Sequence, residues 1–249
     1  MRNQILEICI EKLVEIDGET AVSDCGKIES CLGVLLEFLA NLHNGQSSQL
    51  QSTFYALLIT FERAILRSFR LNYVQYYIYY ICSLDSSFCE HFLGMLFNPF
   101  VAASSSSSVV AVVGVGHTAD ICLAMTANYI SSFVARAAFL EETCVSWSFH
   151  ILLDWMENYL ATWDEISCAV GKHTVFYAVC QAILFIFIFR HRILLPESDP
   201  ECWHKIQPLL SKLVNCSLNP LKVCNPDVVQ EFARISAEYQ LVFCFSVLE

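Results

Sequence analysis

Positive charge is scarce in this sequence, which has 14 lysines and arginines against 25 aspartates and glutamates and a formal net charge of −11. Direct binding to DNA or RNA requires clustered lysine and arginine side chains that contact phosphates. The shortage therefore argues against direct, sequence-specific nucleic-acid binding and favours a protein partner with basic patches. We also expect no signal sequence, because Glu7 and Glu11 interrupt the apolar start of the chain.

The motifs that would indicate an enzyme are missing as well. The sequence has no H-E-x-x-H, P-loop or G-x-S-x-G motif, and no two of its seven histidines are three or four residues apart. His150 and Asp154 lie one helical turn apart and could form a base with its orienting residue, but a hydrogen bond on a helix surface is the simpler interpretation. We predict no catalytic site, no cofactor and no metal.

The thirteen cysteines do not form a recognisable framework. They are odd in number and scattered, and no two of them make a C-x-x-C pair. Such spacing is not typical of a zinc site or of a disulfide-stapled secreted domain. We therefore predict reduced, mostly buried thiols in an intracellular protein.

One nucleotide-binding pattern is present, but it stands alone. The segment 114–119 matches G-x-G-x-x-A after the apolar run 109–113, the arrangement in which a pyrophosphate meets a helix N-terminus. No second strand–helix–strand unit follows it, so a nucleotide-binding enzyme is the weaker hypothesis. We interpret residues 98–117 as a Ser/Gly-rich loop or insertion, with Thr118 capping the next helix.

What the sequence has in abundance is apolar residues, which make up 55% of the chain. The longest apolar run, Val175 to Phe189, is followed directly by Arg190, His191 and Arg192. A membrane-spanning helix needs about 20 apolar residues, whereas this run supplies about 15. We predict a helix that is buried on all sides in the core. A membrane-associated helical protein remains the alternative.

Apolar residues recur with a helical period along most of the chain. The predicted helices are 3–16, 28–43, 52–69, 73–82, 87–97, 119–140, 143–161, 174–190, 200–215 and 226–240. A polar linker is expected at 46–51, a capping box at Ser87-x-x-Glu90, and a helix end at Asn98-Pro99. No segment predicts a sheet. We expect an all-α fold in which consecutive helices pair as a HEAT-like helical-repeat solenoid, forming a single domain over 1–249.

Four blocks of the sequence, in this order, resemble the central part of a known family. They are ANYISSFVARAAF (127–139), FYAVCQAILFIFIFRHR (176–192), NPLKVCNPDVVQEFARI (219–235) and EYQLVFCF (238–245). Their order and spacing are similar to those of the RNA polymerase I-specific transcription initiation factor family, also called TIF-IA. Residues 54–93 resemble the same family more loosely.

The resemblance implies a HEAT-repeat protein of the nucleus and nucleolus. It implies that the protein binds RNA polymerase I subunits and bridges the polymerase to the promoter core factor, so that ribosomal RNA genes are transcribed. It implies neither catalysis nor a cofactor. Family members are longer, so the resemblance also implies that this chain is a shortened version.

The family has a Leu-Ala-Arg-Ala-Lys-like element that is implicated in contacting the promoter factor. The positions that match it are 134–138, where Arg136 is retained and Ala138 replaces the lysine. Our predicted partner-binding residues are this element, its helical neighbours and the cations that end the apolar run. They are Tyr129, Phe133, Val134, Ala135, Arg136, Arg190 and Arg192.

Overall fold

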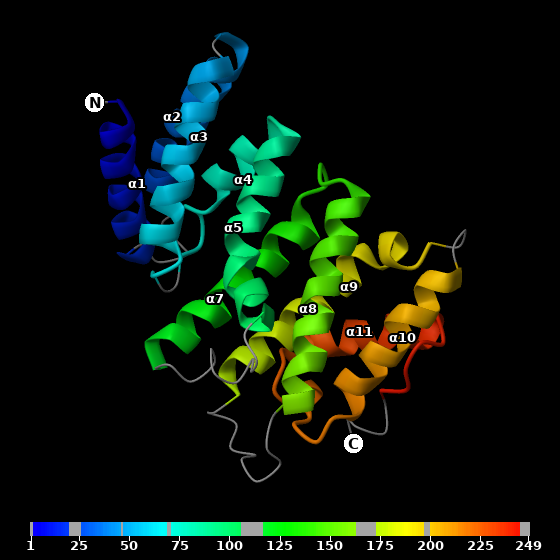
Figure 1. Ribbon diagram of the computed structural model, residues 1–249. Helices are drawn as coiled ribbons and strands as arrows, with labels where there is room; N and C mark the ends of the chain where they lie inside the picture. The colour runs from blue at the N-terminus through cyan, green and yellow to red at the C-terminus, as the bar shows by residue number, and fades with distance from the viewer. Residues whose placement is uncertain are drawn as a thin grey trace. The chain divides into compact units, whose positions relative to one another are not determined.

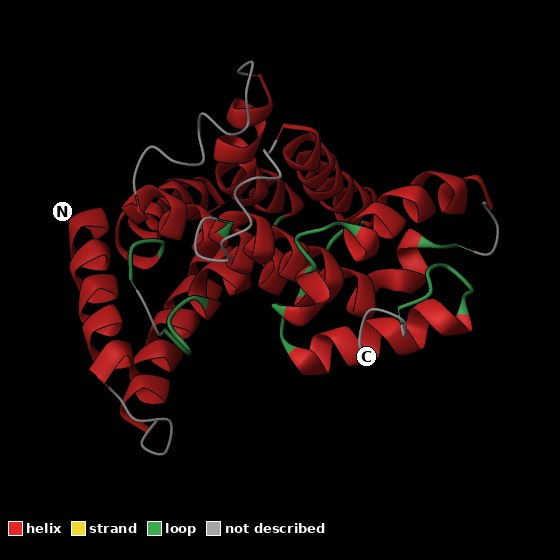
Figure 2. Cartoon of the chain, turned by 90° about the horizontal axis from the view of Figure 1, so that it is seen from below, coloured by secondary structure: helices red, strands yellow, loops and turns green. Residues whose placement is uncertain are grey.

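In the computed structural model, every described element of secondary structure is a helix (Figures 1 and 2). The residues that it describes are 2–19, 26–45, 47–68, 71–105, 117–162, 173–196 and 200–244. No strand occurs among these residues, and the all-α prediction is confirmed. Gly114, Gly116 and the serines at 106–108 lie outside the described residues, so the interpretation of that motif stays a prediction.

The chain divides into two compact units, Met1–Phe92 and Leu93–Glu249. The division falls inside helix α5 (Ser86–Ser105), so residues 86–92 of this helix belong to the first unit and 93–105 to the second. The prediction that the whole chain forms a single domain stays a prediction.

The first unit is built by helices that pack on their neighbours in sequence. They are α1 (Arg2–Glu19), α2 (Gly26–Gly45), α3 (Ser47–Thr60), a π-helical turn η1 (Phe61–Ile65) and α4 (Tyr76–Ser83). α1, α2 and α3 contact one another, and α4 contacts both α2 and α3. The predicted pairs 3–16 with 28–43 and 52–69 with 73–82 are therefore confirmed. Aromatic rings fill the core: Phe54 stacks on Phe88 at 4.2 Å between ring centroids, and Phe61 meets Phe92 edge-on at 5.1 Å.

Asp17 fastens α1 to the segment that leads into α4. Its buried Oδ2 accepts hydrogen bonds from the backbone N–H groups of Asn72, Tyr73 and Val74, at 3.0, 2.9 and 2.9 Å. A buried carboxylate oxygen requires donors, and three backbone donors satisfy Oδ2, whereas the buried Oδ1 has no hydrogen-bond partner among the described residues. This explains why α1 continues to Glu19 rather than stopping at Asp17-Gly18, where its end was expected.

Two predicted breaks are wrong because burial outweighs the local signals. α3 begins at Ser47, so most of the expected linker 46–51 is helical, and Leu50 within it is buried. α5 runs through Pro99 to Ser105, so residues 98–105 of the expected loop 98–117 are helical. Phe100, just beyond the proline, is fully buried, and its ring lies 5.9 Å from that of Trp155. A proline removes one helical hydrogen bond, and the buried aromatic packing offsets that loss.

The start of α5 also differs from expectation. The expected capping box put Ser87 at the N-cap, but the acceptor is Asp85, whose Oδ1 takes hydrogen bonds from Ser87 N at 2.9 Å and Ser87 Oγ at 2.7 Å. An aspartate before the first turn satisfies a helix N-terminus as well as serine does.

The second unit is organised around helix α9. Its elements beyond α5 are α7 (His117–Arg136), α8 (Glu142–Thr162), α9 (Thr174–Leu194), α10 (Pro200–Asn215), a 3₁₀ turn η3 (Pro220–Lys222) and α11 (Pro226–Glu238). α9 contacts α7, α8 and α11, and its contact with α7 is the most extensive in the molecule. The predicted pairing of 143–161 with 174–190 is confirmed, whereas the α7–α9 pairing was not expected.

The polar side chains of the apolar run have defined partners. Tyr177 Oη donates to the carbonyl of Leu218 at 3.0 Å, and Gln181 Oε1 accepts from the backbone N–H of Asn225 at 2.7 Å. Asn225 in turn caps α11, because its side chain accepts from Asp227 N and Val228 N. α9 therefore anchors both the segment after α10 and the start of α11.

By length and composition α9 is also able to cross a membrane, with a mean hydropathy of 1.7 over its most apolar window. However, 56% of that window is buried inside the protein, and α9 is packed on by three other helices. This arrangement is typical of a core helix, and the prediction of burial is confirmed for most of the run but is wrong for one face, where Phe189 is 53% exposed.

We expect Asp17→Ala to weaken the attachment of the segment before α4. Three backbone N–H groups would lose their shared acceptor, at a cost of about 2 kcal/mol, or roughly thirtyfold faster amide exchange. Hydrogen exchange measured by NMR at Asn72, Tyr73 and Val74 checks this. Glu37→Ala, an exposed change on α2, is the matched control. Equal exchange in both variants would show that the carboxylate is dispensable.

Candidate functional site

The seven predicted partner-binding residues fall into two groups in the structure. Tyr129, Phe133, Val134 and Ala135 are buried on α7, with Phe133 and Val134 completely inaccessible. Arg190 is half-buried, whereas Arg136 and Arg192 are exposed. A partner that docks without opening the fold can therefore reach the side chains of Arg136 and Arg192, while the buried four hold α7 against its neighbours. That these residues bind a partner stays a prediction.

Arg190 reaches from α9 to the end of α7. Its Nε donates to the carbonyl of Val134 at 2.9 Å, and its Nη2 donates to the carbonyl of Ala137 at 2.5 Å. The last carbonyls of a helix lack partners within the helix and carry partial negative charge, so a guanidinium stabilises them well. Burial lowers the pKa of Arg190 from its usual value. Arg190 thus stabilises the C-terminal end of α7, which ends at Arg136.

The two exposed arginines frame a pair of phenylalanine rings. The guanidinium of Arg136 lies 5.7 Å from the ring centroid of Phe185, a cation–π distance. The ring of Phe185 lies 4.9 Å from that of Phe189, which is 53% exposed. Arg192 follows Phe189 by three residues on the same helix, so it lies on the same face. We call Arg136, Phe185, Phe189 and Arg192 the α7–α9 surface.

The phenylalanines of this surface were missed because the run was predicted to be buried on every side. The periodicity contains the necessary signal. Positions 181, 185, 189 and 192 follow one another at spacings of three or four residues, and they begin with a glutamine and end with an arginine. A helical face with polar residues at both ends is the face that lies nearest to solvent.

The candidate catalytic groups form no reactive arrangement. His150 Nδ1 donates to the carbonyl of Ser146 at 2.7 Å, one turn earlier in α8, so this ring nitrogen is held by its own helix. Tyr159 Oη and His173 Nδ1 form a buried hydrogen bond of 2.7 Å. Burial raises the pKa of Tyr159 to about 12, so the phenol stays protonated at neutral pH. In the described part of the chain, no three His, Cys, Asp or Glu side chains cluster as metal ligands would.

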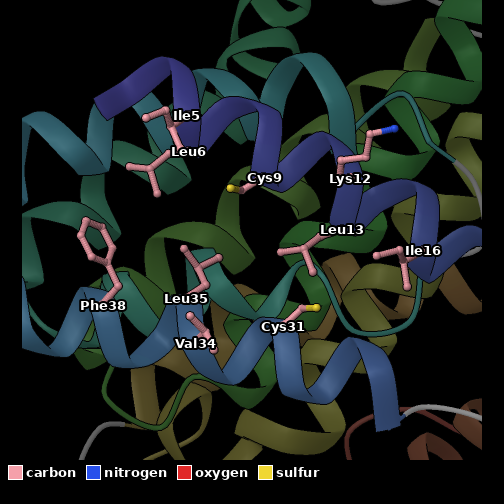
Figure 3. Close-up of a pocket in the computed structure, with 10 residues that line it drawn as sticks. All are labelled: Ile5, Leu6, Cys9, Lys12, Leu13, Ile16, Cys31, Val34, Leu35 and Phe38. Carbon is pink, nitrogen blue, oxygen red and sulfur yellow. The ribbon is translucent and has the colours of Figure 1, made fainter. Parts of the chain in front are cut away.

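An apolar groove of about 850 Å³ lies between α1 and α2 (Figure 3). Side chains of the two helices point toward each other across it, including Leu6 and Leu13 from α1 and Leu35 and Phe38 from α2. Lys12 is the one charged residue among those that line it. The groove offers no acid–base or nucleophilic constellation, although an apolar surface of this kind is typical of a protein contact.

The cysteines divide by their surroundings. Ten are described and all of these are free thiols, of which Cys9 and Cys31 are exposed in the α1–α2 groove. Five others are buried: Cys82, Cys89, Cys180, Cys224 and Cys244. Burial raises the pKa of Cys224 to about 12 and also raises that of Cys180 well above its usual value. Half of the described thiols thus lie in the core, which is fewer than the mostly buried thiols predicted from the sequence.

Comparison with known proteins places this fold and sequence in one group. A family model described as "RNA polymerase I specific transcription initiation factor RRN3" matches residues 23–249. A crystal structure of RNA polymerase I transcription initiation factor Rrn3 matches 99% of this chain and 52% of its own, with a TM-score of 0.81 and 22% sequence identity. At that identity the structural likeness shows the fold alone.

Curated proteins give the same grouping. RNA polymerase I-specific transcription initiation factor RRN3 of Mus musculus is 27% identical over 305 residues, covering 100% of this chain and 44% of the mouse protein. The factor rrn3 of Schizosaccharomyces pombe is 29% identical over 232 residues, covering 90% of this chain and 37% of the yeast protein. The chain therefore spans less than half the length of these two relatives.

We expect Arg190→Met to destabilise the second unit, because two carbonyls at the end of α7 would lose a charged donor. The cost is about 2 kcal/mol, or a fall in melting temperature of roughly 4–8 °C. Arg192→Met removes the same charge two residues later from an exposed position and should change the melting temperature by about 1 °C or less. Calorimetry of both variants checks this. A similar shift in the two would exclude a special role for Arg190.

We expect iodoacetamide to modify Cys9 and Cys31 rapidly at neutral pH. The buried Cys180 and Cys224 should react roughly a hundredfold more slowly or less, because burial blocks access and the raised pKa leaves little thiolate. Peptide mass spectrometry of timed samples measures each site, and labelling in concentrated urea is the control in which all four should react. Fast labelling of Cys180 in the folded protein would contradict the described packing.

Proposed function

Because the chain belongs to the family of RNA polymerase I-specific transcription initiation factors, RRN3, we propose that it acts in transcription initiation by RNA polymerase I. The observation that carries this proposal is the family match over residues 23–249, which includes both units. The all-helical fold and its likeness to the Rrn3 crystal structure support it.

The finer part of the proposal concerns partners and place. The chain binds RNA polymerase I subunits and bridges the polymerase to the promoter-bound core factor, in the nucleus and nucleolus. The relatives support RNA polymerase I as the partner, since each is named as a polymerase I-specific initiation factor. The core factor is proposed as the second partner because residues 134–138 match the family element implicated in that contact. Arg136 of this element is exposed at the end of α7.

In this proposal the protein works as a scaffold and catalyses no reaction. The buried residues of α7 and the Arg190 contacts hold the end of α7 in place, so that Arg136 and Ala138 face solvent at fixed positions. A pre-organised cation such as Arg136 contributes specificity at an interface, because its backbone loses little conformational freedom on binding.

A membrane-associated protein is the second candidate, and the hydropathy of α9 is the observation that favours it. Its residues Val179, Ile183 and Phe187 are fully buried among neighbouring helices, so insertion into lipid would require the second unit to open. The scaffold proposal requires no such opening, and we prefer it.

We expect the tagged full chain to co-purify RNA polymerase I subunits from nuclear extract. A full-length RRN3 family protein, tagged in the same way, is the positive control. The relatives are more than twice as long, so capture by this chain should be weaker than by the control but clearly above that by the tag alone. Loss of all polymerase capture while the control succeeds would reject the proposed function for this chain.

The same pull-down separates the two partners. Arg136→Glu should reduce core-factor capture about tenfold and leave polymerase capture unchanged, since a buried scaffold remains intact. Ala138→Lys, which restores the lysine of the family element, should raise core-factor capture. Ala102→Lys adds the same charge at an exposed position of α5 and is the matched control. An equal gain in both lysine variants would point to non-specific charge attraction.

A further inference from the structure

One face of α9 is less buried than the rest of the helix and becomes exposed toward its C-terminal end. This face runs along Gln181, Phe185, Phe189 and Arg192. The Oε1 of Gln181 accepts a hydrogen bond from the backbone N–H of Asn225 at 2.7 Å, so this end of the face makes a contact inside the second unit. At the other end, the exposed ring of Phe189 adjoins the half-buried ring of Phe185, and Phe189 is among the most exposed large apolar residues of the second unit.

The charge around these rings is unusual for this acidic chain. Among the described residues between Arg67 and Lys205, the lysines and arginines are Arg136, Arg190 and Arg192. Arg190 points to the carbonyls that end α7, whereas Arg136 lies over Phe185 and Arg192 lies beside Phe189 on the same helix face. Two exposed positive charges thus flank an apolar pair in which Phe189 is exposed and Phe185 is half-buried.

We propose that the α7–α9 surface binds a short acidic segment of a partner protein, one that carries leucine or aromatic side chains along one helical face. The apolar side chains of that segment cover Phe185 and Phe189, and its carboxylates pair with Arg136 and Arg192. Aromatic residues and arginine are the residue types that contribute most to binding at protein interfaces. The proposal rests on the proposed function for the identity of the partner, but its chemistry follows from the surface itself.

A single-stranded nucleic acid is the other anionic ligand that stacks on aromatic rings. Such binding requires a groove of several cations that follows the backbone. The α7–α9 surface has two, in a chain with a net charge of −11. A protein segment needs only the pair, because its own apolar side chains supply the rest of the contact.

The test uses the full chain and a fluorescein-labelled amphipathic peptide of about four helical turns, with Leu and Phe on one face and Glu on the other. A second peptide replaces every Glu with Lys, and a labelled uridine oligonucleotide is the nucleic-acid probe. Fluorescence anisotropy measures the affinity of each. The wild-type chain should bind the Glu peptide at least about tenfold more tightly than the Lys peptide and the oligonucleotide.

Four variants show whether this surface is responsible. Phe189→Ser and Arg192→Glu should each weaken binding of the Glu peptide at least about fivefold. Phe243→Ser removes another exposed phenylalanine of the same unit, and Lys222→Glu reverses another exposed cation, so both should leave the affinity unchanged. All four positions are exposed, and circular dichroism verifies that each variant folds.

A smaller preference for the Glu peptide, a smaller loss in the two surface variants, or an equal loss in the controls overturns the proposal, as does tighter binding of the oligonucleotide. Failure here with successful polymerase capture removes this inference and leaves the proposed function standing. Peptide binding without polymerase capture removes the proposed function and leaves the surface as a site for acidic segments.

Discussion

The burial of one apolar helix is the constraint on which the second unit depends. α9 carries the longest apolar run of the chain, and α7, α8 and α11 cover it. Two polar side chains of its apolar run, Tyr177 and Gln181, form hydrogen bonds with the segments before and after η3. Near its C-terminal end, Arg190 donates to a carbonyl at the end of α7. A mostly apolar helix that carries a few polar side chains can therefore position its neighbours through specific hydrogen bonds.

The same helix carries one arginine that contacts the scaffold and one that is exposed to solvent. Arg190 and Arg192 are two residues apart in sequence, yet one is turned to the carbonyls of α7 and the other to solvent. Helical geometry alone separates them, because two residues correspond to more than half a turn. In the proposed function, one element would secure the scaffold with one arginine and offer the next to a partner, so substitutions at the two positions test different properties of the protein.

Much of the fold could be predicted from the sequence, and the exceptions have physical reasons. Periodicity placed the helices, and the length of the apolar run indicated that α9 is internal. The helix through Pro99 was missed because tertiary burial of Phe100 overrides a local break signal. The α7–α9 pairing was missed because sequence adjacency does not determine which helices touch. Arg136 was identified through family resemblance, whereas the exposure of Phe189 was missed because the run was predicted to be buried on every side, although the helical spacing from Gln181 to Arg192 marks this face.

Asp17 has a consequence for how the first unit forms. Its carboxylate joins positions 55 to 57 residues apart in sequence, so this contact closes a long loop. Closing a long loop costs conformational entropy before the contact is formed. Such contacts therefore form more slowly during folding than contacts between residues that are close in sequence. During synthesis, α1 through α3 can associate early, but the charge of Asp17 stays without its donors until the ribosome has released residues 72–74. Completion of this unit is thereby timed to the arrival of α4.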